Sequence, residues 1–289
     1  MRIAAAAYPL DPVASWDEWE AKVERWVATA RADLLVFPEY GGMELAHLDG
    51  PEVAGDLQAS LHAAARHGPR AQAVWATLAR AHRCHILSPS GPWDAGGARP
   101  VNRAFLHGPD GLLGHADKQV MTRFEREAWD VAPGDPLSVF GADGLRVGVA
   151  ICYDAEFPAI AAAMRADILL VPSCTDTVAG WSRVRIAAAA RALEGQCVAV
   201  HSPTVGTCPW SPAVDKNRGR AAILGPPDAG FPDDGILADG AMDEAGWVRA
   251  DVGRTALDAV RREGQVLNRR DAGRAEAAAR AVRAGPWGA

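Results

Sequence analysis

One stretch of the chain limits its fold and its chemistry more than any other. Residues 145–151 form an apolar run that is typical of a buried strand, and the run ends abruptly at Cys152. Asp154, Glu156 and then Pro158 follow, where the chain is expected to turn into a helix. In open α/β sheets, functional groups gather where strands end and helices begin, and helix N-terminal amides can favour a thiolate there. Cys152 is therefore either a small buried hydrophobic residue or a reactive thiol.

The composition is that of a globular protein without a nucleic-acid partner. Hydrophobic residues make up 49% of the 289, enough for a large core, and the net charge of −6 argues against the basic surface that nucleic-acid binding needs. The five cysteines form neither a CxxC pair nor a metal-ligand spacing, so we expect no structural disulfide and no metal. The N-terminus does not resemble a signal peptide, and no apolar run is long enough to span a membrane. A soluble cytoplasmic protein is expected.

Two other strand ends carry charged side chains. Residues 33–37 have the pattern of a buried strand, and Glu39 follows it closely. Residues 102–116 alternate in polarity on both sides of a Pro-Asp-Gly turn, which predicts a β-hairpin that ends near Lys118. Taken singly, the glutamate could be a cap or a salt-bridge partner and the lysine a solvated surface residue. Together with Cys152, however, they place a carboxylate, an ammonium and a thiol at three strand ends.

The order of the expected elements indicates an α/β fold. The expected strands are 3–8, 33–37, 85–88, 102–107, 112–116, 137–140, 145–151, 167–171, 197–200, 221–224, 235–239 and 247–252. Helices alternate with strands in the first half and again after Cys152, and no linker or repeat divides the chain. We therefore predict one domain over residues 1–289, with mixed sheets layered helix–sheet–sheet–helix.

Three segments of this domain carry more specific expectations. Residues 56–82 are predicted as two helices broken near Gly68 and Pro69, because proline disfavours the interior of a helix. Residues 203–219 are predicted as a loop. Residues 254–289 are expected to form a helix and a basic tail on the surface or against a partner subunit.

Glu39, Lys118 and Cys152 form a complete set of groups for acyl transfer. A thiol that attacks a carbonyl needs a base, and a neighbouring carboxylate can take its proton. The tetrahedral intermediate carries negative charge on oxygen, which a desolvated ammonium and the backbone N–H of Tyr153 would stabilise. The leaving amine needs a proton, and the same glutamic acid can return it.

The order and context of these residues resemble the nitrilase superfamily, the carbon–nitrogen hydrolases, whose triad is Glu-Lys-Cys. Family motifs are similar to residues 35–40 (Leu-Val-Phe-Pro-Glu-Tyr), 115–118 (His-Ala-Asp-Lys), 149–154 (Val-Ala-Ile-Cys-Tyr-Asp, with Phe-Pro after it) and 191–196 (Arg-Ala-Leu-Glu-Gly-Gln). The resemblance covers roughly residues 1–225. It implies a four-layer αββα sandwich, a catalytic triad of Glu39, Lys118 and Cys152, no cofactor, and a homodimer or larger homo-oligomer.

The resemblance also implies a second active-site glutamate shortly after the lysine. Glu125 matches the Lys…Glu-Arg-x-x-Trp form without a gap, whereas Glu127 resembles the Glu-Gly-Trp form of the aliphatic amidases. We favour Glu125 because it needs no insertion. The further candidates for oxyanion or substrate binding are Tyr153, Glu127, Trp129, Asp154, Glu156, Thr175 and Trp181. Trp181 could equally belong to the core or to an interface.

Several positions depart from the family pattern where substrate choice is usually made. Tyr8 stands in place of a common glutamine, Glu156 in place of an arginine, and residues 201–206 in place of Asn-x-x-Gly. The resemblance implies an amidase that acts on a small linear amide through a thioester. True nitrilases resemble Cys-Trp-Glu at the nucleophile, whereas this chain has Cys-Tyr-Asp there. An N-carbamoyl amide hydrolase is a close variant. The alternative from another functional class is a catalytically silent protein that binds a partner. Metal-dependent hydrolysis is not favoured, because the sequence shows no Cys/His cluster that could hold a metal.

Overall fold

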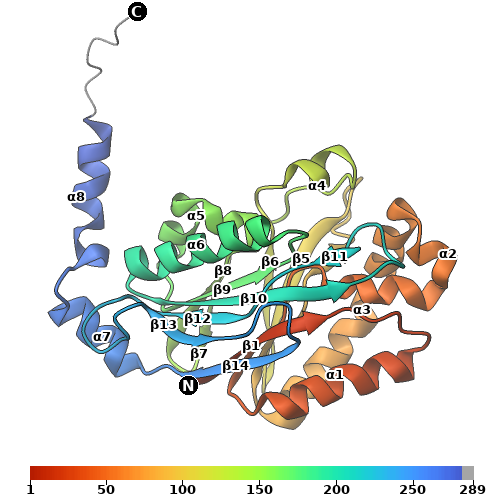
Figure 1. Cartoon of the computed structure of the whole chain (residues 1–289), viewed down its shortest axis with the longest axis horizontal. Coiled ribbons are helices and arrows are strands. Elements are labelled where there is room, and N and C mark those ends of the chain that lie inside the picture. Colours follow the sequence, from red (N-terminus) through yellow and green to blue (C-terminus); the bar gives the residue numbers. More distant parts are fainter. Residues whose placement is uncertain (282–289) are drawn as a thin grey trace, which may run out of the picture.

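The computed structural model describes residues 1–281 and consists of two β-sheets packed face to face between two layers of helices (Figure 1). The first sheet contains, in spatial order, β14 (Gly246–Asp251), β1 (Arg2–Pro9), β2 (Leu34–Val36), β3 (His85–Leu87) and β5 (Val101–Gly108), and β5 also pairs with β4 (Gly91–Trp93) and β6 (Gly111–Asp117). The second contains β13 (Ile236–Asp239), β12 (Ala222–Leu224), β10 (Val198–Thr207), β9 (Ile168–Ser173), β8 (Leu145–Val149) and β7 (Val139–Ala142).

Both sheets are mixed. β1, β2 and β3 run parallel, as do β8, β9 and β10, while β5–β6 and β7–β8 are antiparallel hairpins. A short parallel pairing of Tyr8 with Thr204 and of Pro9 with Val205 joins β1 to β10, and thereby one sheet to the other. The predicted four-layer αββα sandwich with mixed sheets is confirmed.

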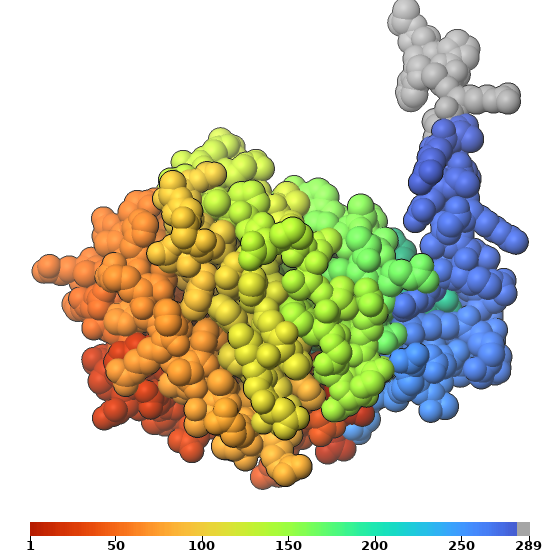
Figure 2. All heavy atoms as spheres, turned by 180° about the vertical axis from the view of Figure 1, so that it is seen from behind, coloured from red at the N-terminus to blue at the C-terminus, as the bar shows by residue number. Residues whose placement is uncertain are grey.

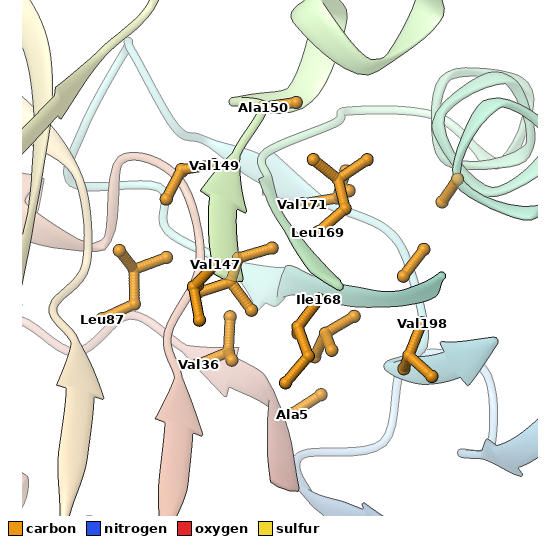
Figure 3. Packing of buried hydrophobic residues seen from close by; sticks show 14 of the residues in the cluster. Ala5, Val36, Leu87, Val147, Val149, Ala150, Ile168, Leu169, Val171 and Val198 are labelled. Carbon is orange, nitrogen blue, oxygen red and sulfur yellow. The ribbon is translucent and has the colours of Figure 1, made fainter. Parts of the chain in front are cut away.

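β1 shows how one strand serves two cores. Its odd-numbered residues point into the space between the sheets, and its even-numbered residues point toward the helices: Ile3, Ala5 and Ala7 on one face, Ala4, Ala6 and Tyr8 on the other. This follows from the two-residue period of a strand, whose successive side chains point to opposite faces. Between the sheets, Ala5, Val36 and Leu87 lie opposite Val147 and Ile168 (Figure 3).

Helices cover the outer face of each sheet. α1 (Trp16–Ala30) and α3 (Leu57–His82) pack on the first sheet, and α5 (Pro158–Met164) and α6 (Val178–Gly195) lie on the second (Figure 1). α1 begins after Ser15, whose side chain accepts a hydrogen bond from the Glu18 N–H, and it buries Trp19 and Val23 at helical spacing. The site residues described below follow the ends of these strands, and the helices pack against the strands that carry them.

The prediction of two helices within residues 56–82 is wrong, because α3 is continuous from Leu57 to His82 with Pro69 inside it. Proline removes only one backbone donor, and the buried face of the helix retains its packing on the sheet. Gly68 has a packing role instead: a Cβ there would lie 2.8 Å from the Trp93 ring. Tertiary contact, rather than a chain break, explains this glycine.

The prediction of a loop over residues 203–219 is wrong in part. β10 continues to Thr207, and β11 (Lys216–Asn217) pairs with its last residues. The extension is stable because the backbone of residues 204 and 205 pairs with β1. Three short helices complete the first half of the chain: the 3₁₀ helix η1 (Gly41–Asp49), α2 (Pro51–Ala54) and α4 (Arg123–Glu127).

The C-terminal segment has two helices of different character. α7 (Arg254–Glu263) buries Leu257 and Val260 against the body, whereas α8 (Asn268–Arg280) buries no residue and stands off the molecule (Figures 1 and 2). The last part of the predicted 254–289 segment, residues 282–289, lies outside the described residues. Across residues 1–281, none of the helices combines the length and apolar character needed to cross a membrane.

Candidate active site

The three strand ends singled out in the sequence come together between the sheets. Glu39 lies three residues after β2, Lys118 directly after β6, and Cys152 three residues after β8. The Lys118 Nζ lies 2.8 Å from the Glu39 Oε1 and 2.7 Å from the Glu125 Oε2. Glu39 and Lys118 are each 1% exposed, Glu125 2% and Cys152 5%. We call these four residues the Lys118 cluster.

The Glu39 carboxylate is held by three donors. Oε1 accepts from the Lys118 ammonium and, at 3.0 Å, from the Asn102 side-chain amide, while Oε2 accepts from the Cys174 N–H at 2.9 Å. A carboxylate has about four lone-pair positions, so one is left for the thiol. Burial raises the pKa of Glu39 to about 7, although Lys118 opposes this and the charge of Glu125 adds to it. Glu39 can therefore gain or lose a proton near neutral pH.

Lys118 stays charged between two carboxylates. Burial alone lowers the pKa of its ammonium, but Glu39 and Glu125 outweigh burial and raise that pKa well above its ordinary value. For Glu125, burial acts to raise the pKa, and Lys118 with the Thr122 and Tyr40 hydrogen bonds brings it below the ordinary value. The two acids thus have different proton affinities: Glu125 remains an anion, and Glu39 is free to titrate.

Cys152 sits on a strained turn at the start of the 3₁₀ helix η2 (Cys152–Glu156). Its φ of +51° lies in the left-handed region, which is rare for a residue with a side chain and is common at functional sites. Helix amides could favour the thiolate, but burial and then the Glu39 charge raise the pKa of Cys152 well above its ordinary value. The resting group is a thiol, so it needs a base to react.

The structure brings Glu125 into the cluster and leaves Glu127 outside it. Glu125 belongs to α4, which Thr122 begins with a reciprocal cap, and its Oε1 accepts from the Tyr40 hydroxyl at 2.7 Å. The exposed Glu127 binds Arg123 one helical turn away, as a surface ion pair. Residues two apart point in different directions on a helix, so only one of the pair can reach Lys118.

The other candidates surround the cluster at varied distance. Trp129 packs edge-on against the Tyr40 ring, with centroids 5.0 Å apart. Both Asp154 oxygens accept backbone N–H groups of residues 119 and 120, so Asp154 ties the segment after Lys118 to the turn after Cys152. The Tyr153 ring packs against Phe157, 4.8 Å between centroids.

Three further candidates make contacts that are structural in character. Glu156 is 3.6 Å from Arg183 in a partly exposed ion pair. The Thr175 hydroxyl donates to the Arg218 carbonyl at 3.0 Å, and the Trp181 Nε1 donates to the Arg220 carbonyl at 3.2 Å. None of these three contacts involves a residue of the Lys118 cluster.

Among the residues that bind the cluster, sequence reasoning missed Asn102, Tyr40, Cys174 and Thr122. The Cys174 backbone N–H binds Glu39, and its carbonyl lies 3.9 Å from the Cys152 Sγ as an acceptor. Tyr40 directly follows Glu39, and Asn102 is a polar residue in a strand that is otherwise mostly apolar. The sequence shows these residues, but it does not show that their side chains or backbone groups point at the cluster.

A group of possible metal ligands lies at the surface side of Lys118. His115, Asp117 and Asp135 place their ligand atoms within 4.8 Å of one another. The Arg103 guanidinium lies among them and donates to Asp117 at 2.6 and 2.7 Å and to Asp135 at 3.0 Å. Arginine already supplies the positive charge, so these residues form an ion-pair network that anchors the end of β6.

Known proteins resemble this chain in sequence and in fold. The family model described as carbon-nitrogen hydrolase matches residues 2–230. A probable hydrolase of Bacillus subtilis (strain 168), YhcX, is 30% identical over 280 residues, which are 94% of this chain and 53% of that protein. The chain thus spans about half the length of this curated relative.

Solved structures agree at lower identity. Nit3 of Saccharomyces cerevisiae, a member of branch 10 of the nitrilase superfamily, has a TM-score of 0.69 at 18% identity, covering 93% of this chain and 96% of that chain. A mutant of the amidase from Nesterenkonia sp. AN1 has a TM-score of 0.63 at 22% identity, covering 91% of this chain and 97% of that chain.

Proposed function

Because the chain belongs to the carbon-nitrogen hydrolase family, we propose that it is a cysteine-dependent amidase that converts a small linear amide into an acid and ammonia or an amine. One observation carries the proposal. Glu39, with a pKa raised by burial to about 7, lies against a protonated Cys152 and shares Lys118 with an ionised Glu125. This is a base, a nucleophile and a fixed positive charge in one dry cluster.

Acylation begins with proton transfer from the Cys152 Sγ to Glu39. The sulfur forms a bond to the amide carbon, and the carbonyl electron pair moves onto oxygen. Lys118 and the Tyr153 N–H stabilise this oxyanion, whose negative charge develops only in the transition state. Glu39 then returns its proton to nitrogen, the C–N bond breaks, and ammonia or the amine leaves a thioester behind.

Deacylation repeats the same steps with water as the nucleophile. Glu39 takes a proton from water, the hydroxide adds to the thioester carbon, and the C–S bond breaks. The proton on Glu39 returns to the sulfur, which restores the thiol, and the acid leaves. Glu125 takes no proton in this cycle; it holds Lys118 in place and keeps the cluster negative enough for Glu39 to accept protons.

The leaving group and the acyl group define the closest alternatives. The Cys-Tyr-Asp sequence supports an amidase, and the Nesterenkonia relative is itself described as an amidase that adds acrylamide at its active-site cysteine. An N-carbamoyl amide hydrolase would use the same steps. A binding protein without turnover would have little use for the strained backbone of Cys152, which costs folding free energy.

A test of this proposal does not require the substrate to be known. Limiting iodoacetamide is added to the native protein between pH 5 and 9, and alkylation of all five cysteines is followed by peptide mass spectrometry. We expect Cys152 to react much faster than Cys84 and Cys197, which lie outside the cluster and whose pKa values burial raises to about 11 and about 12. A panel of small amides, carbamoyl compounds and nitriles is then screened for ammonia release. An unreactive Cys152 in a folded protein, with no turnover, would contradict the proposal.

We also propose a homodimer formed through the outer face of α5 and α6. Val178, Ile186 and Leu193 are 41%, 69% and 42% exposed and recur about every two helical turns, so they line one side of α6. An apolar stripe of this kind on a helix is typical of an interface. Sedimentation should give a dimer that Ile186→Asp dissociates, whereas Leu112→Asp, at an exposed apolar residue on β6, leaves it intact.

A further inference from the structure

Asn102 touches both Glu39 and Lys118, although no step of the reaction uses it. It is the second residue of β5 and is fully buried. Its side-chain Nδ2 donates to the Glu39 Oε1 at 3.0 Å, and its backbone carbonyl accepts from the Lys118 N–H at 2.9 Å. One residue thus binds both the Glu39 carboxylate, through its side chain, and the Lys118 backbone, through its carbonyl.

We propose that Asn102 is a positioning residue that selects Oε2 of Glu39 as the oxygen that takes the thiol proton. The proposal rests on the amidase mechanism above and adds a residue that the mechanism did not require. It concerns the direction and the proton affinity of the base, and assigns Asn102 no contact with the substrate.

The arrangement of donors around Glu39 supports this selection. Oε1 receives two donors, Asn102 and Lys118, whereas Oε2 receives one, the Cys174 N–H. Donors to an oxygen stabilise its negative charge and make it a weaker base, so the proton favours Oε2. Cys174 also contacts the Cys152 Sγ through its carbonyl, which places Oε2 on the side of the thiol.

The other end of the Asn102 side chain argues against a purely structural role. Within residues 1–281, its Oδ1 is buried and has no hydrogen-bond partner. Leaving a buried acceptor unpaired costs folding free energy, which a leucine of similar volume would avoid. Only the donor of this carboxamide is used, and it is used on the base. A neutral donor also stabilises ionised Glu39 without adding a second positive charge beside Lys118.

The first test uses the unaltered protein. The chain contains three asparagines, at positions 102, 217 and 268, so ¹⁵N-asparagine labelling gives three side-chain amide signals. We expect the chemical shift of the Asn102 side-chain amide to change with pH. The midpoint of this change should equal that of the acidic limb of Cys152 alkylation, the pH range over which the alkylation rate rises from its low value in acid. The signal of Asn268, at the start of α8, serves as the reference. An Asn102 signal that stays constant through that midpoint would overturn the proposal.

The second test separates the donor from packing. Asn102→Leu removes the donor and keeps the volume, and Asn102→Ala removes both. Loss of a hydrogen bond to a charged group changes an equilibrium roughly 10- to 100-fold. We therefore expect the acidic limb of kcat/KM to move upward by about one pH unit or more in both variants. At pH 6 the rate falls about tenfold or more, while at pH 9 it stays within about threefold.

His107→Ala is the matched control, on the same strand. His107 is buried, binds Gln72 at 2.9 Å and, within residues 1–281, has no hydrogen-bond partner for its Nδ1. Its replacement by alanine therefore removes comparable packing at a place outside the cluster. We expect it to lower the melting temperature without moving the acidic limb. If the role of Asn102 were purely structural, its variants would behave like His107→Ala. Each would lower kcat/KM by the same factor at every pH, and Asn102→Ala would lower it more than Asn102→Leu.

The alkylation readout keeps this inference separate from the amidase proposal. If Asn102→Leu shifts the pH dependence of Cys152 alkylation but no amide is hydrolysed, the positioning role stands and the amidase proposal fails. If wild-type protein hydrolyses amides and Asn102→Leu leaves both pH profiles unchanged, the amidase proposal stands and the positioning role fails.

Discussion

Lys118 and Lys22 are both buried lysines bound to a glutamate, yet their surroundings prepare them for different tasks. Lys22, from α1, contacts Glu44 of η1, forms an ion pair with Asp11 at 2.8 Å and donates to the Pro9 carbonyl at 2.7 Å. Its ammonium also lies 4.4 Å from the centre of the Tyr8 ring. We call this second group the Lys22 cluster; it pins α1 and η1 to the end of β1.

The two clusters differ in what adjoins the glutamate. Burial raises the pKa of Glu44, as it does that of Glu39. Glu44 accepts from the Tyr8 hydroxyl at 3.1 Å, however, and burial raises the pKa of that phenol well above its ordinary value, so Tyr8 does not give up its proton near neutral pH. Glu39 adjoins a thiol on a strained turn instead. In the proposed mechanism, the neighbouring thiol, and not the buried lysine–glutamate pair alone, distinguishes the first cluster from the Lys22 cluster.

The largest contrast is expected from removing a cysteine near each cluster. Cys152→Ala should lower kcat by at least roughly 1,000-fold, because no other group supplies the nucleophile, and should leave the melting temperature nearly unchanged. Cys208 donates to the Leu10 carbonyl beside the Lys22 cluster, and Cys208→Ala should keep wild-type kcat. Steady-state ammonia release with calorimetry measures both effects. Turnover retained in Cys152→Ala would remove the thioester mechanism.

Neutralising each glutamate should separate activity from stability. Glu39→Gln should lower kcat roughly 10²- to 10⁴-fold, since it abolishes the general base. Glu44→Gln should leave kcat of the folded protein unchanged and lower the free energy of unfolding by roughly 3 kcal/mol, because Lys22 then keeps only the half-exposed Asp11 as a counter-charge. Urea unfolding and initial rates provide the two measurements. If Glu44→Gln lost turnover as severely, the two clusters would not be functionally distinct.

Exchanging each lysine for arginine should have a smaller effect on rate. Lys118→Arg should reduce kcat about 100-fold, because a planar guanidinium cannot occupy the position of a compact ammonium between two carboxylates. Lys22→Arg should cost stability through overpacking and change kcat less than about threefold. Near-normal rates in Lys118→Arg would exclude Lys118 from oxyanion stabilisation.

The smallest effect expected is a pH dependence that belongs to one cluster only. Glu39 acts as a base in its ionised form, and its pKa is about 7, so kcat/KM should rise about tenfold per pH unit below 7 and level off above it. Glu44→Gln should keep this midpoint. A rate profile of the wild type from pH 4 to 9 is the measurement, and a midpoint near pH 4.5 would contradict a base whose pKa burial has raised to about 7.

Several features of the fold and site could be predicted because they depend on local pattern. The buried strands before Glu39 and Cys152 and the hairpin before Lys118 place three groups at strand ends, and strands in one fold bring such ends together. The motifs around these residues also indicated the family, and the family model matches residues 2–230. The wrong helix break at Pro69 arose because a local rule was applied where packing of the whole α3 face decides.

The amino-acid sequence by itself determined which residue types stand at those strand ends and the α/β class, because strand and helix periods are properties of neighbouring residues. Only the tertiary structure decided that Glu125 rather than Glu127 reaches Lys118, that Asn102 binds Glu39, and that the Cys152 thiol is protonated at rest. These outcomes depend on burial and on groups brought together from as far apart in the sequence as Glu39 and Cys152. Desolvation and Coulomb interactions act through space and not along the chain.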